Sequence, residues 1–120
     1  MKFFVAGRWT DRERIRELFA KIIARGHDIA RDWTFYDAST PSGLRECALG
    51  DIRGVKKADV FVLLADKDFQ FRGAYAELGM ALVLGKPVYI IGEFANKCIY
   101  SYHPLVHKVI SIEEVLDETK

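Results

Sequence analysis

Glu77 is the side chain in this sequence whose surroundings most favour chemistry. It lies one turn into a predicted helix and has small neighbours, Gly73, Ala74, Ala76 and Gly79. The helix dipole favours an acid in the first turn, and such acids are common, so a purely structural role is one interpretation. The other is a nucleophile or base held rigidly beside a pocket, with space left by the small residues. Position alone does not decide between them.

The segment around Glu77 predicts a helix followed by a buried strand. Its apolar residues recur at the spacing of a helix that lies on a sheet, i, i+4, i+7 and i+8: Ala74, Leu78, Ala81 and Leu82. Gly85 ends this helix and Pro87 prevents its continuation. Residues 88–91 form a short β-branched and aromatic run, typical of a strand buried on both faces.

The N-terminal half predicts alternating strands and helices. A strand at 3–6 ends at Gly7, and a helix with Thr10 as N-cap in a capping box with Glu13 ends at Gly26. A second strand is predicted at 27–34 and a loop at 35–42. Thr40 and Pro41 begin the next helix, in which Gly50 and Gly54 indicate either a break near Gly50 or the close approach of another backbone.

The C-terminal half continues this alternation. A strand is predicted at 59–64, loops at 65–72 and 93–104, a short strand at 109–110, and a terminal helix that begins with a capping box at Ser111. Strands that alternate with helices predict a three-layer α/β fold with a five-stranded parallel sheet. The natural strand order is the doubly wound, flavodoxin-like or Rossmann-like 2-1-3-4-5, in one domain over residues 1–120.

This topology predicts where a ligand would bind. Doubly wound sheets bind ligands beyond the carboxyl ends of the strands, where the strand order reverses between strands 1 and 3. Residues 7–10, the loop 66–72 and the start of the helix bearing Glu77 converge there. Asp51 lies on the helix that runs back toward strand 3, eight residues before Asp59, and is therefore expected at the same rim. Two carboxylates that face one crevice favour chemistry over a structural role.

Composition limits the classes of partner. The 120 residues carry a net charge of +1, which gives no electrostatic reason to bind nucleic acid or an anionic membrane. Cys47 and Cys98 are expected to be free thiols. The apolar run at the start of the sequence is too short for a signal peptide, and no apolar run approaches the ~20 residues of a membrane span. We expect a soluble, cytoplasmic protein.

Three segments resemble the nucleoside 2-deoxyribosyltransferase family, which includes the 2'-deoxynucleoside 5'-phosphate N-hydrolases. They are residues 3–12 (FFVAGRWTDR), the pair GDI at 50–52 with ADV at 58–60, and AELGMA at 76–81 with LGKP at 84–87. The resemblance weakens over residues 27–45 and after Gly92. The combination of the Glu-Leu-Gly segment with Gly-Lys-Pro is fairly specific, whereas each piece alone is weak.

The resemblance implies roles for individual residues. Glu77 would be the nucleophile that attacks C1' of the sugar, and Asp51 would engage the base and assist its protonation as it leaves. The glycosyl group would then be transferred from the enzyme to another base or to water. Asp59 matches a family position, although an acid at a strand mouth is also readily structural. The substrate would be a small nucleoside or nucleotide, with no cofactor, and the family implies a homo-oligomer, a dimer or larger, in which neighbouring subunits complete each site.

Two positions depart from the transferases of this family. Phe3 replaces a tyrosine on the first strand, and Phe71 with Arg72 replaces a second base-binding aspartate. Arg72, together with Arg8, adds a cation that suits a substrate phosphate better than a neutral nucleoside, although a solvated surface charge is equally consistent with each arginine. Gly7, Trp9, Gly73 and Asp59 complete the predicted substrate-binding set.

Three functions therefore remain open from sequence. The first is cleavage or transfer of an N-glycosidic bond on a (deoxy)nucleoside or its 5'-monophosphate. The second is a catalytically silent nucleotide-binding module, which the missing tyrosine and aspartate favour, and the third is a purely structural oligomer. His103 and His107 have no acid or cysteine at ligand spacing, so we expect no zinc site. The Gly7-Arg8-Trp9 turn lacks the further glycines of a dinucleotide fingerprint.

Overall fold

The computed structural model describes residues 1–36 and 39–119, so part of the predicted loop 35–42 lies outside the described residues. Five parallel strands form one sheet in the order β2-β1-β3-β4-β5. The strands are β1 (Lys2–Ala6), β2 (Asp28–Ile29), β3 (Val60–Leu64), β4 (Val88–Ile91) and β5 (Val106–Val109). The helices are α1 (Arg12–Ala24), α2 (Pro41–Lys57), α3 (Gly73–Val83) and α4 (Ile112–Glu118), with short 3-10 turns at Trp9–Asp11 and Ile99–Tyr102. The α/β class, the parallel sheet and the strand order are as predicted.

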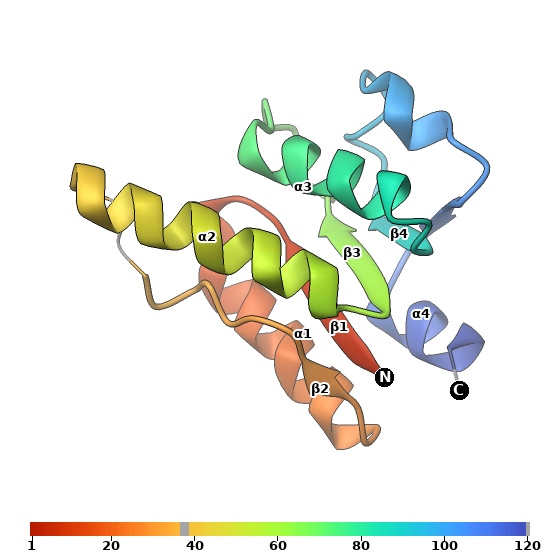
Figure 1. The fold of residues 1–120 in the computed structure, drawn as a ribbon. Coiled ribbons are helices and arrows are strands. Elements are labelled where there is room, and N and C mark those ends of the chain that lie inside the picture. Colours follow the sequence, from red (N-terminus) through yellow and green to blue (C-terminus); the bar gives the residue numbers. More distant parts are fainter. Residues whose placement is uncertain (37–38, 120) are drawn as a thin grey trace.

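The sheet lies between two helical layers, with α2 and α3 on one face and α1 and α4 on the other (Figure 1). Alternate residues of β1 point into opposite layers: Phe3 packs in the core beneath α1 and α4, whereas Phe4 packs beneath α2 and α3. All five residues of β3 are buried, as the continuous apolar run predicted. Both faces of the sheet are therefore covered, and the ends of its strands remain open to a ligand.

Several element boundaries differ from the predictions. The second strand is reduced to Asp28–Ile29 because the chain leaves the sheet edge after two paired residues, and the last strand is Val106–Val109 and not 109–110. Helix α2 runs unbroken through Gly50, so the predicted break there is wrong. The nearest atoms to a Cβ placed at Gly50 or Gly54 belong to the side chains of Arg31 and Phe4. No helix within residues 1–36 and 39–119 has both the length and the apolar character to cross a membrane.

The helix termini test the capping residues that the sequence predicted. Thr40 accepts a hydrogen bond from the Gly43 amide at 3.0 Å, and Ser111 accepts one from the Glu114 amide at 3.3 Å, so both predicted N-caps are confirmed. Gly85 ends α3 with a positive φ of 71°. The capping box predicted at Thr10 is wrong: residues 9–11 form a 3-10 turn, α1 begins at Arg12, and the Asp11 carboxylate binds arginines instead of capping the helix.

Candidate active site

A cavity of about 560 Å³ opens beyond the carboxyl ends of β1 and β3, at the predicted reversal of strand order. Such a volume is within the range of ~300–1,000 Å³ that small-molecule sites occupy. Four parts of the chain line it: residues 7–9 after β1, Trp33 and Tyr36 after β2, Cys47 and Asp51 of α2, and residues 69–74 with Glu77 around the start of α3. Gly7, Arg8, Trp9, Arg72 and Gly73, the predicted substrate-binding residues other than Asp59, all lie in this lining.

Glu77 and Asp51 face this cavity from different helices, α3 and α2. Burial raises the pKa of Glu77 to about 8, and the charge of Asp51 and a hydrogen bond between the two carboxyl groups add to the effect. Arg31 opposes it, because a nearby cation favours the carboxylate form of Glu77. At neutral pH the folded protein therefore keeps a proton on Glu77, next to a second carboxyl group.

Arg31 is a member of the site that the sequence did not reveal. It follows β2, and its Nε donates a hydrogen bond to Oδ1 of Asp51 at 2.8 Å. The side chain of Arg31 is 16% exposed and that of Asp51 is 26% exposed, so water only partly screens this ion pair. The one sequence signal was the pair of glycines on α2, which leave room for the arginine beside Asp51.

Aromatic side chains form much of the cavity wall. Trp33 donates from Nε1 to the carbonyl oxygen of Val5 at 2.7 Å, which fixes its indole beside the end of β1. The rings of Trp9 and Trp33 lie 6.4 Å apart, and Phe69 packs edge-on against Phe71 at 5.4 Å. The faces of such rings suit the stacking of a planar base.

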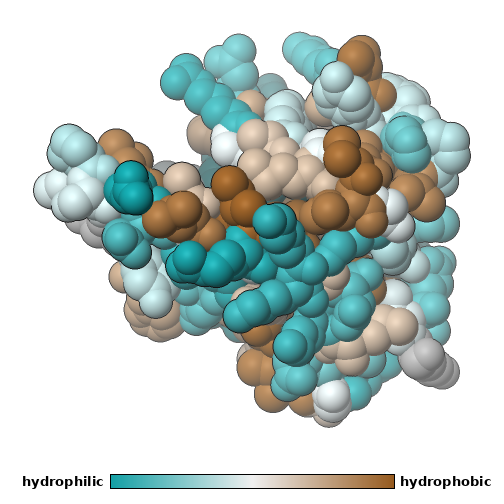
Figure 2. Space-filling view, viewed as in Figure 1, coloured by the Kyte–Doolittle hydropathy of each residue, from teal (hydrophilic) through white to brown (hydrophobic). Residues whose placement is uncertain are grey.

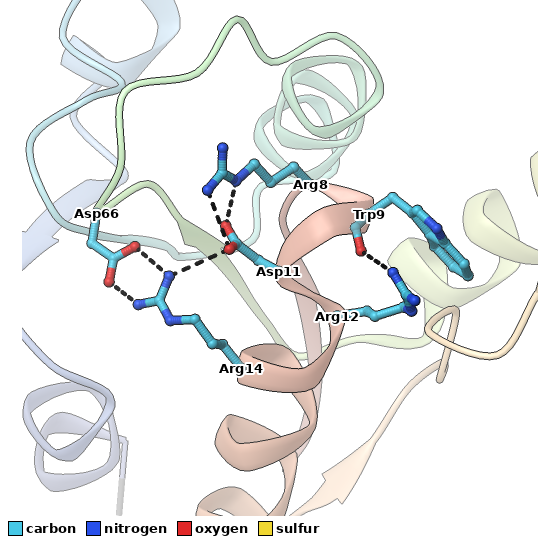
Figure 3. Close-up of polar contacts among 6 residues, drawn as sticks. All are labelled: Arg8, Trp9, Asp11, Arg12, Arg14 and Asp66. Atoms are coloured by element: carbon cyan, nitrogen blue, oxygen red, sulfur yellow. Dashed lines mark hydrogen bonds and ion pairs between the residues drawn. The ribbon is translucent and has the colours of Figure 1, made fainter.

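An ion network fixes the loop after β1 to the loop after β3 (Figure 3). Arg8 donates from Nε to Oδ2 of Asp11 at 2.6 Å, and Arg14 binds both Asp11 and Asp66. Asp11 is nearly fully buried. Burial by itself would raise the pKa of Asp11, but the hydrogen bond and charge of Arg8, with the charge of Arg14, hold it below its usual value. The network joins two walls of the cavity and stabilises its rim.

The two rim arginines differ in availability. Arg8 is bound to Asp11, and its guanidinium lies 5.1 Å from the centre of the Phe69 ring. Arg72 is exposed at the start of α3, and no ion pair joins it to the other residues in the described part of the chain. Arg72 is thus the better placed of the two to meet an anion from solvent.

Two positions from the sequence analysis lie away from the cavity. Asp59 precedes β3 at the opposite end of the sheet, where its carboxylate accepts a hydrogen bond from the Lys2 amide at 2.8 Å. The structure does not bring it to the cavity, because residues that precede a parallel strand lie at the edge away from the ligand-binding rim. Phe3 is fully buried under α1 and α4, with its ring 5.1 Å from that of His27. Residues 1–36 and 39–119 contain no group of three or more His, Cys, Asp or Glu side chains arranged to hold a metal ion.

Comparison with known proteins finds this fold in solved structures. No family model matches the sequence, and no curated protein matches it. A 2-deoxyribosyltransferase from Bacillus psychrosaccharolyticus superposes with a TM-score of 0.75 at 17% identity, over 98% of this chain and 91% of that chain. A CMP N-glycosidase from Clostridium botulinum gives 0.66 at 17% identity, over 98% and 97%. A conserved protein from Enterococcus faecalis gives 0.68 at 20% identity, over 98% and 96%. The chain shares the fold of these three proteins along almost its whole length.

Proposed function

We propose that this protein cleaves or transfers the N-glycosidic bond of a (deoxy)nucleoside or its 5'-monophosphate, with Glu77 as nucleophile and Asp51 as the acid on the base side. The observation that carries the proposal is the pair of carboxyl groups that face one aromatic-walled cavity from two different helices. The fold shared with a 2-deoxyribosyltransferase and a CMP N-glycosidase supports the same class of chemistry.

The retained proton suits this reaction. As the bond between C1' and the base nitrogen breaks, an oxygen of Glu77 bonds to C1' and the bonding electrons leave with the base. The departing nitrogen needs one proton, and the acid pair holds one. If that proton passes through Asp51 to the base, the products are a neutral glycosyl ester on Glu77, an ionised Asp51 and a neutral base. Water or a second base then attacks C1' and releases Glu77.

The cavity lining supports a nucleotide as substrate. Its aromatic walls suit a base, its carboxyl pair suits the sugar carbon and the leaving nitrogen, and Arg72 at the rim suits a phosphate. Hydrolysis of a phosphorylated substrate is the form of the reaction that Arg72 favours. Arg8 supports the rim through Asp11 and is the weaker candidate for the phosphate.

We also propose a homo-oligomer, formed through the outer face of α2 and α3. Figure 2 shows hydrophobic residues along α2 and near the end of α3 on this face. The exposed ones include Leu44, Leu49, Ile52, Val83 and Leu84, with Val83 89% exposed. A groove of about 320 Å³ runs between the two helices on this side. An apolar band of this kind is typical of protein contacts.

Base release from a panel of nucleosides and 5'-monophosphates, measured by chromatography, tests the proposal. We expect release from at least one monophosphate and its loss in Glu77→Ala. Arg72→Gln should lower kcat/KM for the monophosphate about 10- to 100-fold, the value of a charge-assisted hydrogen bond, and leave the matching nucleoside unaffected. Arg53→Gln, which removes an exposed arginine of α2 outside the cavity, is the matched control.

A silent nucleotide-binding module is the second candidate. The absence of an acid at Phe71, which lines the cavity, favours it. Binding of a monophosphate without base release, unchanged by Glu77→Ala, would establish the module and reject the enzyme.

A further inference from the structure

The side chain of Arg31 lies in a seat made by two glycines on α2. A Cβ at Gly50 would lie 2.3 to 2.6 Å from three guanidinium atoms of Arg31, and a Cβ at Gly54 would lie 2.8 Å from the Arg31 Cβ. Any other residue at position 50 would thus occupy the space of the guanidinium. One helical turn separates the two glycines, so the seat follows one face of α2, next to Asp51.

The seat aims the guanidinium at the acid pair. Besides the hydrogen bond from Nε to Asp51, the Cζ of Arg31 lies 4.7 Å from the centre of the Tyr36 ring, and Tyr36 lines the cavity. The arginine is thus held between α2 and an aromatic ring, with its Nε bonded to Asp51. A guanidinium in such a place is both a fixed hydrogen-bond donor and a permanent charge.

We propose that Arg31 is the positioning residue of this site: it holds the Asp51 carboxyl group toward the cavity and offsets the negative charge of the acid pair, so that the pair can give up its one proton to the leaving base. This inference rests on the proposed function. When the proton departs with the base, Asp51 remains as a carboxylate beside the glycosyl ester, and Arg31 is the cation bonded to it. Without that cation the pair would hold its proton more tightly.

Other charged or titratable groups face the same cavity and bear on its pH dependence. They are Tyr36 after β2, Cys47 on α2, Arg8 after β1 and Arg72 at the start of α3. Arg8 is bound to Asp11 and Arg72 is exposed at the rim. In the described part of the chain, Arg31 is the one cation with a hydrogen bond to either member of the pair.

The pH profile of kcat/KM separates this role from a merely structural one. Base release requires one proton in the pair, so activity should fall on the alkaline side near pH 8 in the wild type. In Arg31→Gln this fall should move up by about one pH unit, with kcat lowered on the order of 100-fold by loss of the fixed geometry. Arg31→Lys keeps the charge without the planar fork, so the fall should stay near its wild-type pH while kcat drops. Arg53→Gln is the control for loss of an arginine elsewhere on the surface.

Gly50→Ala tests the seat without altering charge. The added methyl group should displace the guanidinium from Asp51 and lower kcat. Because both changes act on the same contact, Gly50→Ala should cost little further in the Arg31→Gln background. If the losses of activity in this double-mutant cycle were additive, the proposal that Gly50 acts by making room for Arg31 would be rejected.

A readout independent of activity keeps this inference separate from the proposed function. The carboxyl group of Glu77, followed by ¹³C NMR, should titrate at higher pH in Arg31→Gln than in the wild type. If the wild type releases base but neither the pH profile nor this titration moves, the role of Arg31 is refuted and the enzyme stands. If no substrate releases base and the titration still moves, the proposed reaction is refuted and the electrostatic role of Arg31 stands.

Discussion

Replacing Glu77 by glutamine should stabilise this protein in alkaline solution. Glutamine has nearly the same shape as protonated glutamic acid but cannot ionise, so it mimics the state that Glu77 keeps in the folded protein. Between pH 4.5 and about 8 the unfolded chain loses the Glu77 proton while the folded chain retains it. The stability that the proton contributes is therefore present at low pH and is lost as pH rises through 8.

The size of this effect follows from the pKa. Raising it from 4.5 to about 8 corresponds to an upper limit of about 5 kcal/mol, at ~1.4 kcal/mol per pH unit. Glu77 is partly open to the cavity, so water reduces the effect. We expect the wild type to lose about 2–4 kcal/mol of unfolding free energy through Glu77 between pH 5 and pH 9.

Urea unfolding at pH 5, 7 and 9, at one protein concentration, measures this loss. Glu77→Gln should match the wild type at pH 5 and exceed it increasingly at pH 7 and 9. Glu46→Gln, an exposed position on α2 outside the cavity, should follow the wild type throughout. A difference between Glu77→Gln and the wild type that stays constant from pH 5 to 9 would refute the retained proton, and with it the proposed supply of a proton to the leaving base.

Three further outcomes test the structure of the site. Asp51→Asn removes the charge that helps to keep the Glu77 proton, so the Glu77 carboxyl group should titrate at lower pH by ¹³C NMR while base release falls at least ~100-fold; an unchanged titration would show that the two groups do not interact. Asp11→Asn should cost about 1–2 kcal/mol at pH 7, because the depressed pKa of Asp11 gives a contribution that is present above its ordinary value of 3.8 and is lost as pH falls below it; urea curves that differ equally at pH 7 and pH 2.5 would contradict the network. A bound 5'-monophosphate should slow maleimide labelling of Cys47, which lines the cavity, by about tenfold or more at ten times its Kd, and leave Cys98 unaffected; equal protection of both thiols by mass spectrometry would argue against binding in this cavity.

The sequence predicted those features that depend on local pattern and on the rules of parallel sheets. Buried apolar runs gave β3 and β4, glycine gave the end of α3, and the strand order placed Glu77 and Asp51 at one rim. Features that depend on tertiary contacts could not be predicted from the sequence. Asp11 reads as part of a helix start but pairs with Arg8 and Arg14, because a buried carboxylate gains more from two guanidinium groups than from capping.

The place of Arg31 in the site could not be predicted from the sequence for a related reason. An arginine in a weakly patterned segment resembles any surface charge, and only the fold brings it over the glycines of α2. From sequence the same glycines predict a weaker helix, because propensity alone makes each about 0.5–1 kcal/mol worse than alanine. The helix continues through them because its buried face, made by Gly50, Gly54 and Val55, packs against the rest of the fold, and packing outweighs propensity.

The energetic features of the cavity favour the enzyme over the silent module. Stacking a base and binding a phosphate require aromatic walls and a cation, which Trp33 and Arg72 supply without any buried acid. Such binding does not require the buried acid Glu77, whose raised pKa lowers stability at neutral pH, and the two glycines beside Arg31 lower the helix propensity of α2. Departures from the local rules of stability concentrate where chemistry requires them. Here they meet at one point, where a sugar carbon would lie between a nucleophile and a proton donor.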